Sequence, residues 1–194
     1  MKPLVVLVGN SRKKLDRLKK LYSDNKPLIA HDVVVVYNGE EKYKCDLKTE
    51  NNRQGRDVYM YHKAVMKWKR DFYFFMNDDI IHIEGTDWLE NALRLKAEIV
   101  GAQTNLSSIV SSKIIKKLSG KNPSRGTNPQ FIRTSAFGCT RDYFLRIWEE
   151  SKGNSQRFEK NTLKLANSWA VLCDAFYIHD ENLHSYFNYY RGQK

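Results

Sequence analysis

The chain has 194 residues, of which 41% are hydrophobic and 28% are charged. This length supports one domain with a substantial core, and the composition excludes a disordered chain or a low-complexity fibre. Lys and Arg number 33 against 22 Asp and Glu, so the formal net charge is +11. Such an excess favours partners that carry negative charge, namely nucleic acid, phosphorylated small molecules or an anionic surface.

No apolar run approaches the roughly 18 residues that a membrane-spanning helix needs, and the first residues lead into a strand rather than a secretory signal. The three cysteines, Cys45, Cys139 and Cys173, are far apart and odd in number. This pattern argues against a disulfide framework or a thiolate zinc site. We therefore expect a soluble, cytoplasmic protein with reduced thiols.

Apolar, β-branched runs alternate along the chain with segments of helical periodicity. We expect strands at 3–8, 31–37, 71–76, 80–83, 99–103, 130–139 and 170–178, and helices after Ser11, at 56–70, after Asp87, at 108–118, after Thr140 and at 155–167. The Pro- and Gly-rich loop 120–129 is a candidate lid. The alternation predicts an α/β fold with a mostly parallel sheet, in which the loops 9–12, 38–42 and 77–79 share the ligand-binding edge.

Two adjacent carboxylates interrupt the apolar segment 72–83, FYFFMNDDIIHI. At about 6 Å and an effective dielectric constant near 20, such charges repel by about 3 kcal/mol. A divalent cation would offset this repulsion, and oxygen ligands suit Mg²⁺ or Mn²⁺ when a diphosphate completes the coordination. Asn77, Asp78 and Asp79 are equally typical of a hairpin turn, but their position after the third strand favours the ligand edge.

The surroundings of this acid pair resemble the glycosyltransferases of the GT-A fold. Lys63 and Trp68 precede the aromatic strand, 130–144 (QFIRTSAFGCTRDYF) is similar to the acceptor-side strand and helix, and Glu159 and a late His complete the pattern. The resemblance covers about residues 3–180. It implies one Rossmann-like GT-A domain over 1–194, with a nucleotide-binding half at 1–83 and an acceptor-binding half at 84–194. A compact domain of this kind suits a virus-encoded member, or a piece of a longer polypeptide.

The resemblance also implies an activity, namely transfer of a sugar from a nucleoside-diphosphate sugar, UDP-sugar first, to a hydroxyl of a glycan or glycoprotein. The implied cofactor is Mn²⁺ or Mg²⁺, with Asp79 and His179 as metal ligands and His184 in reserve. Glu159 and Asp78 are the implied catalytic residues. The implied nucleotide contacts are Gly9, Asn10, Ser11, Arg12, Asn38, Arg53, Arg56, Lys63, Asn77 and Asp78.

The sequence departs from the family pattern at two places. Asn77 stands where the first acid of Asp-x-Asp is expected, so the metal would depend on Asp79, a His and the diphosphate. Glu159 is followed by Lys160 rather than by a second acid. An inverting enzyme needs a general base, for which Glu159 and Asp174 are candidates, whereas a retaining enzyme can lack one.

Two other classes of protein fit parts of the sequence. In a Mg²⁺-dependent nucleic-acid-processing or nucleic-acid-binding protein, the acid pair would hold the metal and the net positive charge would bind the phosphate backbone. In a non-catalytic basic α/β module, residues 77–79 would be only a turn. The basic and aromatic segment 181–194 would be an acceptor surface, a stacking platform or a packed terminus.

Overall fold

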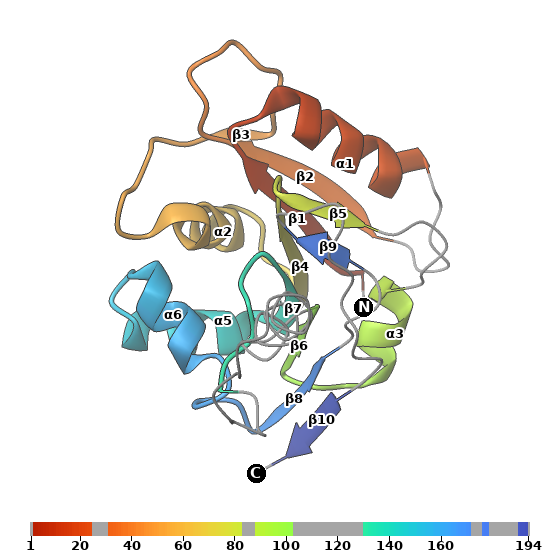
Figure 1. Ribbon diagram of the computed structural model, residues 1–194, viewed down its shortest axis with the longest axis vertical. Coiled ribbons are helices and arrows are strands. Elements are labelled where there is room, and N and C mark those ends of the chain that lie inside the picture. The colour runs from red at the N-terminus through yellow and green to blue at the C-terminus, as the bar shows by residue number, and fades with distance from the viewer. Residues whose placement is uncertain are drawn as a thin grey trace, which may run out of the picture.

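The computed structural model describes residues 2–24, 31–82, 88–102, 130–171, 176–178 and 190–193 (Figure 1). Its elements are β1 (Leu4–Gly9), α1 (Arg12–Asp24), β2 (Asp32–Tyr37), β3 (Leu47–Lys48), α2 (Arg56–Lys67), β4 (Phe72–Asn77), β5 (Ile80–His82), α3 (Trp88–Arg94), β6 (Ile99–Gly101), β7 (Ala136–Thr140), α5 (Arg141–Glu150), α6 (Ser155–Asn161), β8 (Ser168–Val171), β9 (Phe176–Ile178) and β10 (Tyr190–Gln193). Within these residues, no helix is long and apolar enough to cross a membrane.

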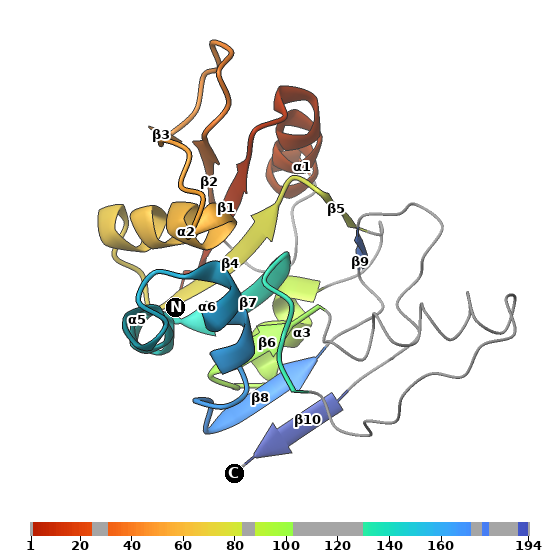
Figure 2. The same cartoon turned by 60° about the vertical axis from the view of Figure 1, so that its left-hand side comes forward.

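The strand β1 lies near the centre of the main sheet and is buried along its whole length. Val6 and Val8 belong to an apolar cluster with side chains of α2, α5 and α6, whereas Val5 and Leu7 belong to a second cluster with α1 and α3. Figures 1 and 2 show these two groups of helices on opposite sides of the sheet. Because both faces of β1 are covered, the strand carries apolar side chains at successive positions.

The described strands form an eight-stranded sheet in the order β10-β8-β6-β7-β4-β1-β2-β3, and β5 pairs with β9 in a second, two-stranded sheet. The pairs β1–β2, β1–β4, β2–β3 and β6–β8 are parallel, whereas β4–β7, β6–β7 and β8–β10 are antiparallel. The predicted α/β class with a mostly parallel sheet is therefore confirmed, with antiparallel strands inserted in its second half.

This topology brings four chain segments to one edge of the sheet. The carboxyl ends of β1, β2 and β4 lie there because these strands are parallel neighbours. The amino end of β7 lies there as well, because β7 runs antiparallel to β4 and Ala136 pairs with Met76. The Asn77 N–H donates to the Ser135 carbonyl at 2.9 Å, which ties the segment before β7 to the end of β4. The predicted shared edge is thus confirmed, and it also includes Ser135.

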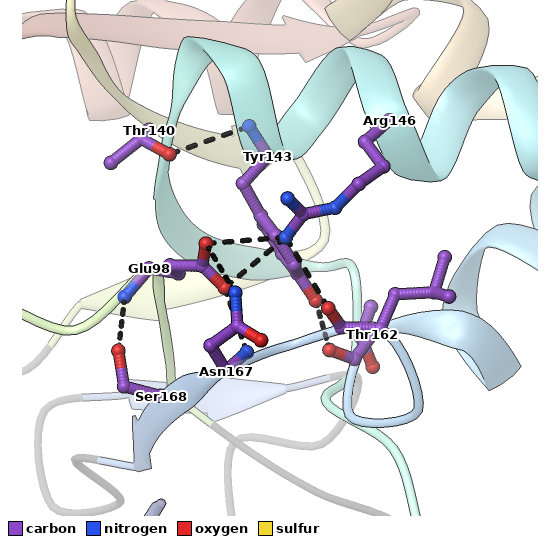
Figure 3. Close-up of polar contacts among 8 residues, drawn as sticks. Glu98, Thr140, Tyr143, Arg146, Thr162, Asn167 and Ser168 are labelled. Carbon is purple, nitrogen blue, oxygen red and sulfur yellow. Dashed lines mark hydrogen bonds and ion pairs between the residues drawn. The ribbon is translucent and has the colours of Figure 1, made fainter. Parts of the chain in front are cut away.

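Glu98, just before β6, ties this strand to α5 and to the start of β8 (Figure 3). Its carboxylate oxygens each accept from the Arg146 guanidinium at 3.2 Å, and one accepts from the Asn167 N–H at 2.8 Å. The Thr140 side chain accepts from the Tyr143 N–H and caps α5, as its sequence predicts. Charge-assisted contacts to backbone and side chain together lock α5 onto the sheet.

Two predicted elements are shorter than expected because their backbone groups have other partners. The predicted strand 130–139 begins only at Ala136, since the Ile132 N–H donates to the Thr162 hydroxyl oxygen at 2.7 Å. The predicted helix 155–167 ends at Asn161, and the Thr162 hydroxyl donates to the Glu159 carbonyl at 2.8 Å. Thr162 therefore joins the end of α6 to the segment that leads into β7.

The predicted strand 170–178 is two strands in two sheets. β8 pairs with β6 and β10, whereas β9 pairs with β5. β10 adds an antiparallel strand to β8, which the sequence did not predict. The predicted helix 108–118 and the candidate lid 120–129 lie outside the described residues.

Candidate functional site

Asp78 fastens the turn after β4 to the loop after β1. Its Oδ2 accepts from the N–H groups of Asn10 at 3.0 Å and Ser11 at 2.8 Å, and the residue is only 7% exposed. A Cβ on Gly9 would lie 2.2 Å from the Asp78 Cγ, so this close approach requires glycine. Burial raises the pKa of Asp78 and the neighbouring Asp79 charge adds to this, whereas the hydrogen bonds from Ser11 and Asn10 oppose the rise.

Asp79 presents its carboxylate at the surface, with 41% of its side chain exposed. The Lys14 ammonium, from the first turn of α1, lies 2.8 Å from Asp79 Oδ1, and this hydrogen bond raises the pKa of Lys14. The chain itself therefore offsets the two adjacent carboxylates, with backbone N–H groups at Asp78 and an ammonium at Asp79. Their repulsion alone does not require a cation, contrary to the expectation from sequence.

Asn77 lies behind this pair and is 5% exposed. Its Nδ2 donates to Asp57 Oδ2 at 3.0 Å, and its Oδ1 accepts from the Asp79 N–H at 3.3 Å. Asp57 lies in the first turn of α2, and burial raises its pKa, with the Asn77 hydrogen bond opposing and the charges of Asp78 and Asp79 adding to the rise. Asp57 was not predicted as a site residue, because an acid in a first helical turn is ordinarily explained by the helix dipole.

A hollow of about 710 Å³ opens beside this turn, between the β1–α1 loop and the end of β2. It is lined by Asn10, Ser11, Arg12, Lys13, Asp16, Tyr37, Glu40 and Glu41. The buried hydroxyl of Tyr37 has no hydrogen-bond partner among the described residues. Within the same residues, the buried Asn38 Oδ1 also lacks a partner, although the Asn38 amide donates to Asn51. The predicted residues Gly9, Asn10, Ser11, Arg12 and Asn38 are therefore brought to one place.

Of the four predicted basic contacts, Arg12 begins α1, and the other three lie on or just before α2 and are exposed. Arg56 begins the helix with a positive φ of 46°, next to Asp57. The Lys63 ammonium lies 5.0 Å from the centre of the Tyr59 ring. At 1.5 Å per residue, Lys63 is about 9 Å farther along the helix axis than Asp57. Arg53 precedes α2.

Glu159, on α6, reaches the same edge through the segment before β7. Its carboxylate accepts from the Thr134 hydroxyl at 3.2 Å and lies 3.5 Å from the Arg133 guanidinium. Thr134 is followed by Ser135, whose carbonyl accepts from the Asn77 N–H. Burial raises the pKa of Glu159, whereas the Arg133 charge and the Thr134 hydrogen bonds lower it. A partly buried carboxylate with a raised pKa is suited to accepting a proton.

Of the predicted metal ligands, the structure describes only Asp79. His179, His184 and Asp174 lie outside the described residues; β9 ends at Ile178, which pairs with Ile80, the residue after Asp79. Among the residues that the structure describes, no group of three or more His, Cys, Asp or Glu side chains is arranged to hold a metal ion. The half-exposed Asp79 carboxylate is a suitable oxygen ligand for Mg²⁺ or Mn²⁺, but it would need further ligands.

No protein-family profile and no curated protein sequence match this chain. Solved structures do. TarS of S. aureus has a TM-score of 0.53 at 16% identity, over 93% of this chain and 37% of TarS. A197 of STIV has a TM-score of 0.48 at 15% identity, over 93% of this chain and 87% of A197. A glycosyltransferase involved in the glycosylation of the major capsid of PBCV-1 has a TM-score of 0.46 at 8% identity, over 89% of this chain and 82% of that one.

At these identities the likeness shows a shared fold. The chain is a GT-A-like α/β protein, as the resemblance in its sequence predicts, with the Asp78–Asp79 turn at the carboxyl edge of the parallel strands. It spans about 37% of the length of TarS.

Proposed function

We propose that this protein is a glycosyltransferase that moves a sugar from a nucleoside-diphosphate sugar to a hydroxyl of a glycan acceptor. One observation carries the proposal: the Asp78–Asp79 turn is fastened to the β1–α1 loop beside a hollow at the carboxyl ends of β1, β2 and β4. In open α/β sheets, ligands bind at this edge. The GT-A-like fold supports the same reading.

The hollow suits the nucleoside better than the diphosphate. Its lining carries the basic Arg12 and Lys13 but also the acidic Asp16, Glu40 and Glu41. Such a mixed lining offers no net attraction to an anion, whereas the hydroxyl of Tyr37, which has no partner among the described residues, is a hydrogen-bonding group for a polar base or ribose. We propose that a uridine in this hollow directs its diphosphate toward Lys14, in the first turn of α1, and toward Asp79, in the turn after β4.

We propose Asp79 as the protein ligand of Mn²⁺ or Mg²⁺, with the diphosphate and His179 as further ligands. When bound, the cation would neutralise the negative charge of the diphosphate. The exposed ammonium of Lys14 is placed to attract the same anion. Asp78 would act by holding the β1–α1 loop that shapes the hollow, since its Oδ2 is taken up by two backbone N–H groups.

Glu159 is the proposed general base. As the acceptor oxygen bonds to the anomeric carbon, the bond from that carbon to the diphosphate oxygen breaks, and the hydroxyl proton passes to the Glu159 carboxylate. The raised pKa of Glu159 favours this transfer at neutral pH. Arg133, at 3.5 Å, would keep the carboxylate ionised before the acceptor binds.

A thermal-shift panel tests this function. UDP, other nucleoside diphosphates and DNA or RNA oligomers are each added to the protein with and without Mn²⁺. A ligand that binds only the folded state stabilises it and so raises the melting temperature. At a ligand concentration of 100 times the Kd, this stabilisation is about 2.7 kcal/mol. We expect a shift with UDP and Mn²⁺ together. A shift with an oligomer and none with any nucleoside diphosphate would instead support the nucleic-acid-binding alternative, which the net charge of +11 favours.

A further inference from the structure

The Asn77 amide has two different partners, and they fix its orientation. The Asp79 N–H is a donor and must face the amide oxygen, which turns the amide nitrogen toward Asp57. This nitrogen donates to Asp57 Oδ2 at 3.0 Å in a setting where Asn77 is 5% exposed. Asn77 is thus a rigid link between the first turn of α2 and the turn that carries Asp79.

An aspartate at position 77 could not form this link. It would accept from the Asp79 N–H, but its other oxygen would face the Asp57 carboxylate at about the same 3.0 Å. Two carboxylates this close cannot both be ionised, so they must share a proton or move apart. The residue that departs from the Asp-x-Asp pattern is therefore the one that Asp57 requires.

We propose that Asp57 is a positioning residue, which through the Asn77 amide sets the place of the Asp78–Asp79 turn for the cation and the diphosphate. The inference rests on the proposed function and deepens it. Asp57 lies on a helix that is firmly held, because Val58 and Tyr61 of the same helix are buried in the core and the Tyr61 hydroxyl donates to the Thr134 carbonyl. A site supported by a packed helix is held more closely than one supported by a loop alone.

The predicted consequence is that acid and amide can trade places. In the double variant Asp57→Asn with Asn77→Asp, the amide at 57 donates to the carboxylate at 77, whose second oxygen still accepts from the Asp79 N–H. Charge and volume are preserved in this double variant. The single variant Asp57→Asn keeps an acceptor, the amide oxygen, for the Asn77 nitrogen and is the matched control. Only the single variant Asn77→Asp places two carboxylates face to face.

The experiment measures binding of UDP in the presence of Mn²⁺ by calorimetry, and of Mn²⁺ alone by electron paramagnetic resonance. Supporting residues of metal sites change metal affinity about 10- to 100-fold, so we expect Asn77→Asp to weaken Mn²⁺ binding at least about tenfold. We expect the double variant to remain within about threefold of the wild type and thus to reverse the loss. Asp57→Ala removes the acceptor of the Asn77 amide and should weaken Mn²⁺ binding as well, whereas Asp57→Asn keeps an acceptor at this place and should bind like the wild type. Melting temperatures confirm that each variant is folded.

Three outcomes would count against these conclusions. Tighter Mn²⁺ binding by Asn77→Asp would show that position 77 itself can ligate the cation, and would overturn the inference. Unchanged binding by Asn77→Asp would overturn it as well, while leaving the proposed function standing. A wild-type protein that binds neither Mn²⁺ nor UDP would overturn the proposed function, and with it the role of Asp57.

As a reference for a purely structural loss, Glu98→Gln weakens the contacts at Arg146 and Asn167 and should lower the melting temperature without changing Mn²⁺ affinity.

Discussion

The Lys14 ammonium lies 2.8 Å from the Asp79 carboxylate, so the acid proposed to receive a divalent cation already has a positive partner from its own chain. Both side chains are close to half exposed, at 47% and 41%. An exposed ion pair of this kind contributes about 0–1 kcal/mol. Lys14 can therefore be displaced by a cation at little cost, and its side chain is then available to the diphosphate.

This pairing predicts opposite effects of Lys14→Gln on two ligands. Because a competing ammonium is removed, affinity for Mn²⁺ alone should rise by up to about fivefold, the most that an exposed ion pair of about 1 kcal/mol allows. Affinity for UDP in saturating Mn²⁺ should fall, because a positive charge near the diphosphate is lost. Titrations followed by electron paramagnetic resonance and calorimetry measure the two effects. Lys20→Gln, on the same helix and outside the lining of the hollow, is the matched control, and equal changes in both variants would show only a loss of general positive charge.

Asp78 should depend on its hydrogen-bonding oxygen more than on its charge. In Asp78→Asn, a single amide oxygen can still accept from the Asn10 and Ser11 N–H groups, and the burial that raises the pKa of Asp78 no longer opposes a charge. In Asp78→Ala, both N–H groups lose their partner, at a cost of about 1–3 kcal/mol each if they stay buried. Urea unfolding at pH 7 should rank Asn well above Ala. Equal losses of unfolding free energy in the two variants would contradict the role of Asp78 in holding the β1–α1 loop through hydrogen bonds.

Glu159 should make stability depend on pH in a defined direction. Burial raises the pKa of Glu159 in the folded protein above its ordinary value of 4.5, so the folded state holds this proton more tightly than the unfolded state. The stability that this proton contributes is fully present below pH 4.5 and is lost as the pH rises through the folded-state pKa. Glu159→Gln lacks this loss. The melting temperature of Glu159→Gln minus that of the wild type should therefore rise from pH 4 to pH 7. A difference that does not change with pH would refute the raised pKa of Glu159.

Tyr37→Phe should separate stability from ligand binding. The Tyr37 hydroxyl is buried without a partner among the described residues, so its removal should leave the melting temperature unchanged or raise it. If the hydroxyl contacts the nucleoside, UDP affinity should fall by about 0.5–1.5 kcal/mol. Tyr61→Phe is the control, because its hydroxyl donates to the Thr134 carbonyl and its loss should lower stability. Unchanged UDP affinity in Tyr37→Phe would exclude that hydroxyl from the site.

The central strands could be predicted from the sequence because their surroundings are uniform. β1 and β4 are buried at every position, and runs such as PLVVLV and FYFFM have no other stable place in a small α/β fold. The shared edge of the loops after β1, β2 and β4 follows from parallel pairing, which the βαβ alternation predicts. The sequence pattern predicted a strand through Ile132 and a helix through Thr162, and both predictions were wrong. The Ile132 N–H instead donates to the Thr162 hydroxyl oxygen, 30 residues away in sequence.

The site could be predicted in outline but not in its charges. Asp78 and Asp79 stand out because two adjacent carboxylates interrupt an apolar segment, whereas neither Lys14 nor Asp57, in the first turns of their helices, shows its partner in the sequence. Their partners are 65 and 20 residues away in sequence, so no local pattern reveals them. For the same reason the sequence pointed to a cation that would offset the acid pair, whereas backbone N–H groups and Lys14 already do so.

The most direct measurement is an anomalous difference map from crystals of this protein soaked with Mn²⁺ and UDP. We predict a manganese peak at the Asp79 carboxylate, bridged to the diphosphate, with Lys14 turned away from its present partner and uridine in the hollow beside Tyr37. A map with no manganese at Asp79, or with the nucleotide bound away from the carboxyl edge of β1, β2 and β4, would contradict it.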